Sequence, residues 1–480
     1  MWAHCAPGHY SAGGLVTAKR EATVTEGPGE HEFDIVVLGM GPGGEYTATQ
    51  LAESGLSVAG VEARLVGGEC PYWGCVPTKM MIRAANLLTE GRRIPAMAGA
   101  SAVSPDWELV AGRIRADATD NWDDSVAADR FTGAGGTLFR GHGRITGPAE
   151  VTVGADVLRA RRGIVINTGT APAVPPIPGL AGTPFWTNRE IVETRDVPQS
   201  LAVLGGGPVG AELAQVFARF GAEATVVEAA DHLLPAEEPE SGELLARVFA
   251  DEGITVSTGA AAESVSHDTG GFSLTLAGGS RIRAQRLLVA TGRATNLASL
   301  GIGALDLDES ARFIPVDDQM RAAPGVWAIG DVTGHGGYTH MSIYQAEIAV
   351  CAILGRPHHP AEYHAVPLVT FTDPEIGRVG MTAAEARDRL GNVMTGTSQV
   401  PASARGWIHK AGNAGFIKLV ADAERGVLVG ATSAGPMGGE VLSMLTLAVH
   451  AAVPLGRLTE MIYAYPTFHR AVHEALEQLG

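Results

Sequence analysis

Short apolar runs, each ended by glycine or by an acidic residue, mark the strands in the first part of the chain. Residues 33–38 form such a run and predict a buried parallel strand. Glycines follow at positions 39, 41 and 44, and small and apolar residues over 47–54 indicate a helix. A second run, residues 57–61, ends at Glu62. This order of strand, glycine turn, helix, strand and acid is typical of a Rossmann unit.

The same order of elements recurs near the middle of the chain. An apolar run over 201–204 leads into a glycine turn, a helix is expected up to residue 220, and the next run, 224–227, ends at Glu228. The glycines of this turn are Gly205, Gly207 and Gly210. Such glycines let the backbone approach a pyrophosphate, and the acid can accept hydrogen bonds from ribose hydroxyls. One glycine pattern alone is weak evidence, but two complete copies predict that the protein binds two dinucleotides.

Two cysteines, Cys70 and Cys75, follow the first unit with four residues between them. A dithiol placed just after a nucleotide site indicates redox chemistry rather than a structural disulfide. The chain has only two other cysteines, Cys5 and Cys351, which is too few for the disulfide framework of a secreted protein. We expect Cys351 to be a core thiol, because its neighbours form an apolar helix.

The length and composition of the chain indicate which broad class of protein it belongs to. The chain has 480 residues, enough for several domains, and 45% of them are hydrophobic and 18% charged. A net charge of −17 argues against nucleic acid and anionic membranes as partners. The N-terminus lacks the apolar core of a signal peptide, and no uncharged stretch is long enough to span a bilayer. These features predict a cytoplasmic enzyme with a flexible N-terminal extension, residues 1–32.

Further motifs connect the chain to a known family. They are Asn-Thr-Gly-Thr at 167–170, Ala-Thr-Gly-Arg at 290–293, an apolar run ending in Asp331, and Phe-Thr-Asp-Pro at 371–374. With the glycine and cysteine motifs, they make residues 33–478 resemble the class I pyridine nucleotide-disulfide oxidoreductases. That group contains dihydrolipoamide dehydrogenase, glutathione reductase and mercuric reductase.

The resemblance implies an α/β fold with two Rossmann-like dinucleotide-binding domains and a C-terminal α+β dimerisation domain. The FAD-binding domain would comprise residues 33–180 and 306–365. The NAD(P)-binding domain would comprise 181–305, and the dimerisation domain 366–480. The resemblance also implies a homodimer in which the last domain completes the active site of its partner.

The two glycine turns take different cofactors in this family, and no metal site is expected. The resemblance places FAD at Gly39, Gly41, Gly43, Gly44, Glu62, Gly68, Thr168, Gly169, Gly330, Asp331 and His340. It places the nicotinamide cofactor at Gly205, Gly207, Gly210, Glu228 and Gly292. A 2′-phosphate would meet the like charge of Glu228, and no arginine follows within several residues, so NADH is favoured over NADPH.

The resemblance also assigns roles around the dithiol. It implies that Cys75 faces the flavin as the charge-transfer thiolate, while Cys70 exchanges with the substrate. Lys79 would lie near the flavin N5 with Glu212 as its partner. A helix N-terminus and Lys79 would both stabilise the thiolate.

The C-terminal segment departs from the family pattern. Most dithiol-handling members carry His-x-His-Pro-Thr-x-x-Glu, in which the second His is the acid/base and the Glu orients it. Here Tyr465 stands at the base position and Arg470 at the glutamate position. Tyrosine is a poor base at neutral pH, although its hydroxyl can donate a hydrogen bond. The departure indicates an unusual small-molecule substrate.

Three hypotheses remain open from the sequence. The first is an FAD-containing reductase that passes electrons from NADH through Cys70 and Cys75 to a disulfide or other acceptor. The second is an NAD(P)H:quinone or metabolite oxidoreductase or dehydrogenase, possibly biosynthetic, that works without dithiol exchange. The third is a flavoprotein that acts as a redox-sensing partner without turnover.

Overall fold

The computed structural model describes residues 29–479 and divides into two compact units. The first unit contains the described residues up to Pro77 together with Gly112–Pro172 and Arg293–Glu362. The second contains Thr78–Ala111, Ala173–Gly292 and the residues from Tyr363 onward. Most of the expected N-terminal extension, including Cys5, lies outside the described residues.

A central parallel sheet organises the first unit. Its strand order is β16 (Arg321–Ala323), β17 (Val326–Ala328), β6 (Asp156–Ile166), β1 (Glu30–Leu38), β2 (Val58–Glu62) and β3 (Thr137–Arg140), with β16 antiparallel to β17. The hairpin β4 (Gly143–Gly147) and β5 (Glu150–Val153) extends the sheet from β6. Residues Ile35, Val36 and Val37 of β1 are fully buried, as expected for a parallel strand covered on both faces.

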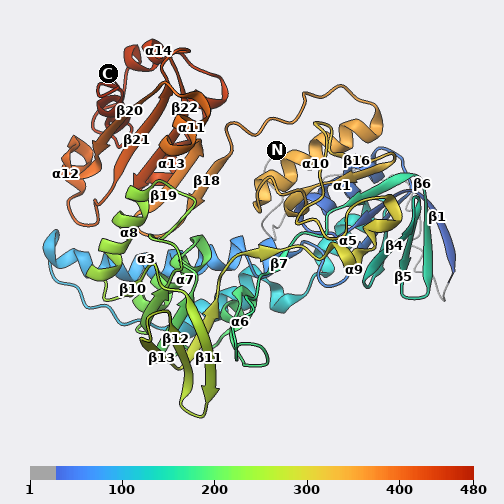
Figure 1. Ribbon diagram of the computed structural model, residues 1–480, viewed down its shortest axis with the longest axis horizontal. Helices are drawn as coiled ribbons and strands as arrows, with labels where there is room; N and C mark the ends of the chain where they lie inside the picture. Colours follow the sequence, from blue (N-terminus) through green and yellow to red (C-terminus); the bar gives the residue numbers. More distant parts are fainter. Residues whose placement is uncertain (1–28, 480) are drawn as a thin grey trace, which may run out of the picture. The chain divides into compact units, whose positions relative to one another are not determined.

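Two helices of the first unit pack against each other beside this sheet. They are α1 (Pro42–Glu53) and α10 (Thr339–Leu354), and Figure 1 shows them side by side. The approach is close because Gly43 has no side chain, and a Cβ there would collide with the Ser342 hydroxyl. The N-termini of both helices therefore lie near the carboxyl ends of the strands.

The second unit contains a second parallel sheet and a small antiparallel one (Figure 1). The parallel sheet has the order β10 (Thr255–Ser257), β9 (Glu223–Val227), β8 (Ser200–Leu204) and β14 (Arg286–Val289). The antiparallel sheet consists of β11 (Ala262–Asp268), β12 (Gly271–Leu276) and β13 (Arg281–Ala284). The helices α7 (Pro208–Arg219) and α8 (Pro239–Asp251) accompany the parallel strands.

An antiparallel sheet with helices on both faces forms the C-terminal part of the second unit. Its order is β18 (Pro367–Thr370), β19 (Glu375–Gly380), β22 (Val427–Gly435), β21 (Phe416–Asp422) and β20 (Val393–Gln399). The helices α13 (Gly438–His450) and α15 (Arg470–Leu476) share a core with Leu419, whereas α11 (Ala383–Leu390) shares one with Val420. Because successive strand residues point to opposite faces, these helices cover the two sides of the sheet.

Short elements complete the chain. The remaining helices are α2 (Glu69–Tyr72), α3 (Cys75–Arg93), α4 (Trp107–Arg113), α5 (Ser125–Gly133), α6 (Asn188–Glu193), α9 (Leu297–Leu300), α12 (Ala404–His409) and α14 (Leu455–Glu460). The two short strands β7 (Ala171–Pro172) and β15 (Arg293–Ala294) pair with each other. Single helical turns occur at Ile94–Ala96, Ile114–Ala118, Asp120–Trp122, Ile302–Leu305, Gly330–Thr333 and Val400–Ala402.

The strands and the mixed α/β fold expected from the sequence are confirmed, but the first helix begins earlier than expected. It starts at Pro42 rather than near residue 47. For α7 only the end near residue 220 was predicted, and the helix runs from Pro208 to Arg219. Proline suits the first helical position because its N–H would have no intrahelical partner there. No helix within residues 29–479 is long and apolar enough to cross a membrane. The domain limits given above stay a prediction.

Candidate active site

The first glycine turn joins β1 to α1 and depends on the absence of side chains. Gly39 has φ +88°, and a Cβ there would lie 2.8 Å from the carbonyl carbon of Asn167. A Cβ on Gly44 would collide with the carbonyl oxygen of Gly39. At Gly41 the nearest atom to a Cβ would be 3.5 Å away, so the backbone there remains approachable. The turn presents the N-terminus of α1 as an anion site.

Glu62, at the end of β2, fixes the backbone of this turn through hydrogen bonds. The Glu62 carboxylate accepts hydrogen bonds from the backbone N–H groups of Met40 and Arg64, both at 2.8 Å. Burial raises the pKa of Glu62, and these two N–H groups oppose the rise. Gly68 has φ +67°, and a Cβ there would lie 2.8 Å from Gly41 Cα, so the cysteine segment begins directly against the turn.

Asn167, quoted in the sequence analysis only as the start of the motif 167–170 and given no role there, ties the turn to α10. Its side-chain amide donates to the Gly39 carbonyl at 3.1 Å, and its carbonyl oxygen accepts from the Ser342 hydroxyl at 3.3 Å. Neither that motif nor its place at the end of the apolar strand β6 indicated these two contacts. The neighbouring Thr168 and Gly169 follow in the loop, and Gly169 has φ +63°.

Asp331, expected to bind FAD, lies in a cluster of polar side chains at the end of β17. Its carboxylate accepts from the Thr170 hydroxyl at 2.6 Å and lies 3.7 Å from Arg293 Nε. Gly330 has φ +77° and donates its N–H to the Gln345 side chain at 2.7 Å. These contacts fix the loop that precedes α10.

The cysteines occupy two consecutive helices of the motif. Cys70 is half-buried in α2, whereas Cys75 is exposed and is the first residue of α3. Cys75 Sγ lies 3.5 Å from the hydroxyl oxygen of Thr339, the first residue of α10. His340 follows, and its ring stacks on Tyr338 with centroids 5.3 Å apart. The structure therefore places Cys75 between two helix N-termini, where partial positive charge favours a thiolate.

The second glycine turn, between β8 and α7, repeats the first. Gly205 has φ +108°, and a Cβ on Gly210 would collide with its carbonyl oxygen. The Glu228 carboxylate is buried and accepts from the N–H groups of Gly206 at 2.7 Å and Ala230 at 2.8 Å. A Cβ on Gly207 would have no atom within 4 Å, so this position is open to a ligand.

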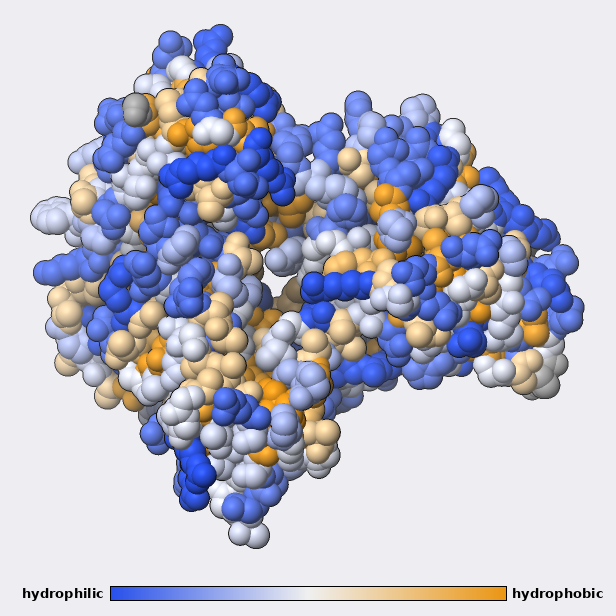
Figure 2. Space-filling view, viewed as in Figure 1, coloured by the Kyte–Doolittle hydropathy of each residue, from blue (hydrophilic) through white to orange (hydrophobic). Residues whose placement is uncertain are grey.

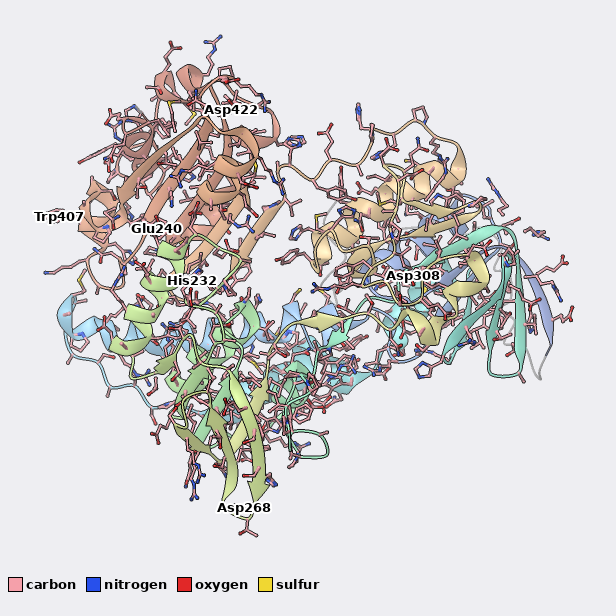
Figure 3. The ribbon with its side chains drawn as sticks, viewed as in Figure 1. His232, Glu240, Asp268, Asp308, Trp407 and Asp422 are labelled. Carbon is pink, nitrogen blue, oxygen red and sulfur yellow. The ribbon has the colours of Figure 1, made fainter. Side chains whose placement is uncertain are left out.

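The segment after Glu228 packs onto the second turn. A Cβ on Gly206 would lie 2.6 Å from a methyl group of Leu233, and Leu234 N–H donates to the Gly206 carbonyl at 2.9 Å. His232, labelled in Figure 3, has its Nδ1 2.8 Å from the Leu233 carbonyl oxygen. Gly292, the last predicted residue of this site, has φ +118° and open space at its Cβ position.

The expected ion pair between Lys79 and Glu212 is present. Lys79 Nζ lies 2.9 Å from Glu212 Oε2, and the Glu212 side chain is only 5% exposed. The other oxygen of Glu212 accepts from Phe371 N–H at 2.8 Å. The Phe371 ring centroid lies 4.8 Å from Lys79 Nζ, close enough for a cation–π interaction. Phe371 thus restrains both members of the pair, which sequence reasoning did not foresee.

Two further residues of α7 hold the segment that contains Phe371. Gln215 accepts from Asp373 N–H at 2.8 Å and donates to the Asp373 carbonyl at 2.9 Å. Arg219 donates to the Asp373 carboxylate at 2.9 Å and to both oxygens of Glu252. Glu212, Gln215 and Arg219 are spaced to lie on one face of α7.

The two tyrosines near the C-terminus differ in exposure. Tyr463 is buried and donates its hydroxyl to the Leu458 carbonyl at 3.0 Å, and burial raises its pKa. Tyr465 is 73% exposed, and its side chain makes no hydrogen bond or ion pair within residues 29–479. Cys351 is half-buried in α10 rather than fully in the core. No group of three or more residues suited to a metal occurs in the described part of the chain.

Both glycine turns fit a dinucleotide. Each offers an open backbone at its second glycine and a helix N-terminus, and each has a carboxylate whose oxygens retain lone pairs for further donors. The first turn lies beside the cysteine segment, through Gly68, and the second lies at the start of the helix that carries Glu212. The arrangement can bind two nucleotides and place a dithiol next to one of them.

Comparisons with known proteins agree with this geometry. The family model "Pyridine nucleotide-disulphide oxidoreductase" matches residues 33–350, and the model of that family's dimerisation domain matches residues 366–476. A dihydrolipoyl dehydrogenase of Chlorobaculum tepidum is 34% identical over 92% of this chain and 96% of its own. A mercuric reductase of Acidithiobacillus ferrooxidans is 33% identical over 91% of this chain and 80% of its own. The Cu(II) complex of the HOCl-induced flavoprotein disulfide reductase RclA from Escherichia coli is 25% identical, with TM-score 0.82 over 94% of this chain and 100% of that one.

Proposed function

The chain belongs to the pyridine nucleotide-disulphide oxidoreductase family, and we propose that it carries electrons from NADH through Cys70 and Cys75 to a small-molecule acceptor. It is an oxidoreductase, and its family implies FAD and a pyridine nucleotide as cofactors. The observation that carries the proposal is the dithiol itself, which begins directly against the first glycine turn at Gly68. A disulfide is our first candidate acceptor.

In this proposal FAD is held by the first turn, by Glu62 and by the loop around Asp331. When bound, FAD accepts a hydride from the nicotinamide and releases electrons as a pair. The chain's own residues do the rest. Cys75, at the N-terminus of α3, carries the charge of the reduced dithiol, and Cys70 is left to exchange with the acceptor. Lys79 is held in place by Glu212 and Phe371 as a fixed positive charge.

The preference for NADH rests on the second turn. Both oxygens of Glu228 already accept backbone N–H groups, so the carboxylate is fixed and charged where an adenosine 2′-phosphate would approach. The segment 229–238 contains no arginine or lysine that would offset this charge. Activity with NADPH far above that with NADH would contradict the assignment.

A second candidate function is favoured by Tyr465. This exposed tyrosine stands where dithiol-handling relatives have a histidine base, so thiol exchange at Cys70 lacks its usual proton acceptor. A quinone or similar acceptor needs no such base. The names of the two sequence relatives refer to dihydrolipoyl groups and mercuric ion, and neither is assigned to this chain as a substrate.

The dimerisation domain supports a homodimer, and we propose that residues around Tyr465 complete the partner's site. Among the described residues of one chain, the exposed Tyr465 side chain has no hydrogen-bond or ion-pair partner. This is expected if a second subunit covers it.

Replacing Cys70 by serine separates the two candidate functions. Disulfide reduction should fall to background, since the exchanging sulfur is gone, whereas quinone reduction should continue. Unchanged disulfide turnover in this variant would overturn the dithiol mechanism. A matched variant, Cys351→Ser, changes a half-buried cysteine of α10 and should alter neither activity.

A further inference from the structure

Residues 233–238, which we call the anchor segment, connect the second glycine turn to the C-terminal sheet of the same unit. We propose that Arg378, on β19 of that sheet, is a positioning residue for the pyridine nucleotide, because it holds the anchor segment against the turn. The inference deepens the proposed function and rests on its assignment of the nucleotide to the second turn. Arg378 acts through the backbone of the anchor segment rather than on the ligand itself.

The first end of the anchor segment packs on the glycine turn. Leu234 N–H donates to the Gly206 carbonyl at 2.9 Å, and a Cβ on Gly206 would lie 2.6 Å from a methyl group of Leu233. Both leucine side chains are buried. Gly206 N–H in turn donates to the Glu228 carboxylate at 2.7 Å. A shift of the anchor segment would therefore move both the turn and the acid beside it.

The backbone of the anchor segment is strained at Leu234. This residue has φ +53°, in the left-handed region that leucine rarely adopts. Such a conformation persists only where surrounding contacts hold it. Glu237 N–H donates to the Leu234 carbonyl at 2.9 Å and closes the segment into a turn. The position of this turn therefore depends on the contacts that Glu237 makes beyond it.

Two cations of the C-terminal sheet bind successive carboxylates at the second end of the anchor segment. Arg378 Nε lies 2.8 Å from Glu237 Oε2, and Lys418 Nζ lies 2.8 Å from Glu238 Oε2. All four side chains are at most 12% exposed, so water and salt screen these ion pairs little. The other oxygen of Glu238 accepts from the N–H of Ala383, the first residue of α11, at 2.6 Å.

The Arg378 guanidinium is itself fixed on the sheet. Its Nη1 donates to the Gly380 carbonyl at 2.7 Å and lies 3.9 Å from the Glu385 carboxylate. Burial raises the pKa of Glu237, and the charge of Arg378 opposes the rise. Without the guanidinium, the Glu237 carboxylate would be buried without a counter-charge, which is strongly unfavourable. The anchor segment would then have to move to bring Glu237 to water.

The test uses the FAD-loaded protein and ADP-ribose, which carries the adenosine and pyrophosphate of the nucleotide but cannot reduce the flavin. Arg378→Met removes the charge, Arg378→Lys retains it, and Glu237→Gln keeps the shape of the carboxylate without its charge. Ser398→Ala is the control for lost stability, because it removes the buried hydrogen bond from Ser398, on β20 of the same sheet, to the Ala471 carbonyl. Isothermal titration calorimetry gives the dissociation constant of ADP-ribose. Hydrogen exchange followed by mass spectrometry gives the protection of the anchor segment.

We expect the dissociation constant to rise about tenfold in Arg378→Met, because part of the binding free energy then goes into ordering the turn. Exchange in the anchor segment should become faster in the same variant. Glu237→Gln should change both signals in the same direction, and Arg378→Lys should stay within about threefold of the parent. Ser398→Ala should unfold at a lower temperature with unchanged affinity. The rate of flavin reduction at saturating NADH should change by less than about twofold in Arg378→Met, as expected for an effect on binding alone.

Equal affinities of the parent and Arg378→Met overturn the inference. An equal loss of affinity in Ser398→Ala also overturns it, since the effect would then follow from stability alone. If Arg378→Met does not fold, Glu237→Gln makes the same comparison with the parent. A parent protein that binds neither ADP-ribose nor NADH contradicts the proposed function as well, whereas the first two results leave that function standing.

Discussion

At the scale of single residues, the site depends on charges whose positions are fixed by backbone groups. Glu62 and Glu228 each accept two N–H groups, and Glu212 accepts Phe371 N–H while it pairs with Lys79. Such carboxylates have lost most of their conformational freedom before any ligand binds. Because their positions are already fixed, they can stabilise charge at a reacting centre without first having to reorient.

Replacing Glu212 by glutamine tests the charge on this residue. The amide still accepts from Phe371 N–H, but it leaves the Lys79 ammonium without its counter-charge. We expect flavin reduction by NADH, measured by stopped flow, to slow about tenfold, equivalent to about 1.4 kcal/mol. Glu240→Gln is the matched control, because Lys418 retains Glu238 as a partner there. An equal rate in Glu212→Gln and the parent would contradict the role of the pair.

The pairing of Lys79 with Glu212 was predictable from sequence motifs, whereas the residues that support it were not. Gln215 and Arg219 lie in a segment whose pattern indicates only a helix, and the motif at 371–374 gives Phe371 no partner. Their contacts arise when a distant segment docks on α7, and apolar periodicity carries no information about such long-range polar contacts. The contacts of Asn167 with Gly39 and Ser342 were not predicted for the same reason.

At the scale of elements, α7 links the second glycine turn to the segment 371–373. It begins at that turn and presents Glu212, Gln215 and Arg219 along one face. The strands β8 and β9 and the helix α7 between them follow from the apolar runs. The four-residue helix α2, which carries Cys70, has no periodicity and was not predicted, because so short a helix is stabilised by its surroundings.

Gln215→Leu should loosen the segment that α7 holds. It removes two hydrogen bonds to the Asp373 backbone and leaves buried polar groups unpaired, which costs about 1–3 kcal/mol. Chemical denaturation followed by circular dichroism measures the loss. Gln399→Leu, at an exposed position of β20, is the control and should change stability by less than about 0.5 kcal/mol. Equal stabilities of the two variants would contradict the docking role of α7.

Glu375 predicts a pH dependence of stability. Its carboxylate accepts Gly439 N–H at 2.9 Å near the start of α13, but burial dominates and raises its pKa. The folded protein therefore holds this proton more tightly than the unfolded chain, and stability falls as pH rises through the folded pKa. Glu375→Gln removes the charge and should gain up to about 1 kcal/mol at pH 7.5 and nothing at pH 4. Thermal unfolding of the parent and of Glu375→Gln at both pH values tests this. A larger gain in stability at pH 4 than at pH 7.5 would contradict the predicted direction of the pH dependence.

At the scale of the whole molecule, the chain is acidic and carries a dimerisation domain. Its net charge is −17, and the face drawn in Figure 2 is largely hydrophilic with apolar residues in scattered groups. The two dinucleotide turns and the family were predictable from the sequence, because each turn is a local pattern. The acceptor was not, since in our proposal it depends on how a second subunit completes the site.

Mixing two variants tests the proposed sharing of the site. Cys70→Ser and Tyr465→Ala would each be inactive in disulfide reduction, but a mixed dimer contains one site with neither change. Random exchange of subunits should therefore restore about a quarter of the parent activity. Full activity of Tyr465→Ala alone would show that this residue takes no part, and no recovery on mixing would place both residues in the same subunit's site.

The most direct test of the central claim is anaerobic titration with NADH. We predict that the first equivalent produces two new thiols per subunit, at Cys70 and Cys75, together with long-wavelength absorbance from the Cys75 thiolate. The flavin band near 450 nm should remain largely unbleached until the dithiol is reduced. If the first equivalent bleaches the flavin fully and no thiol forms, electrons do not pass through the cysteine pair and the account is wrong.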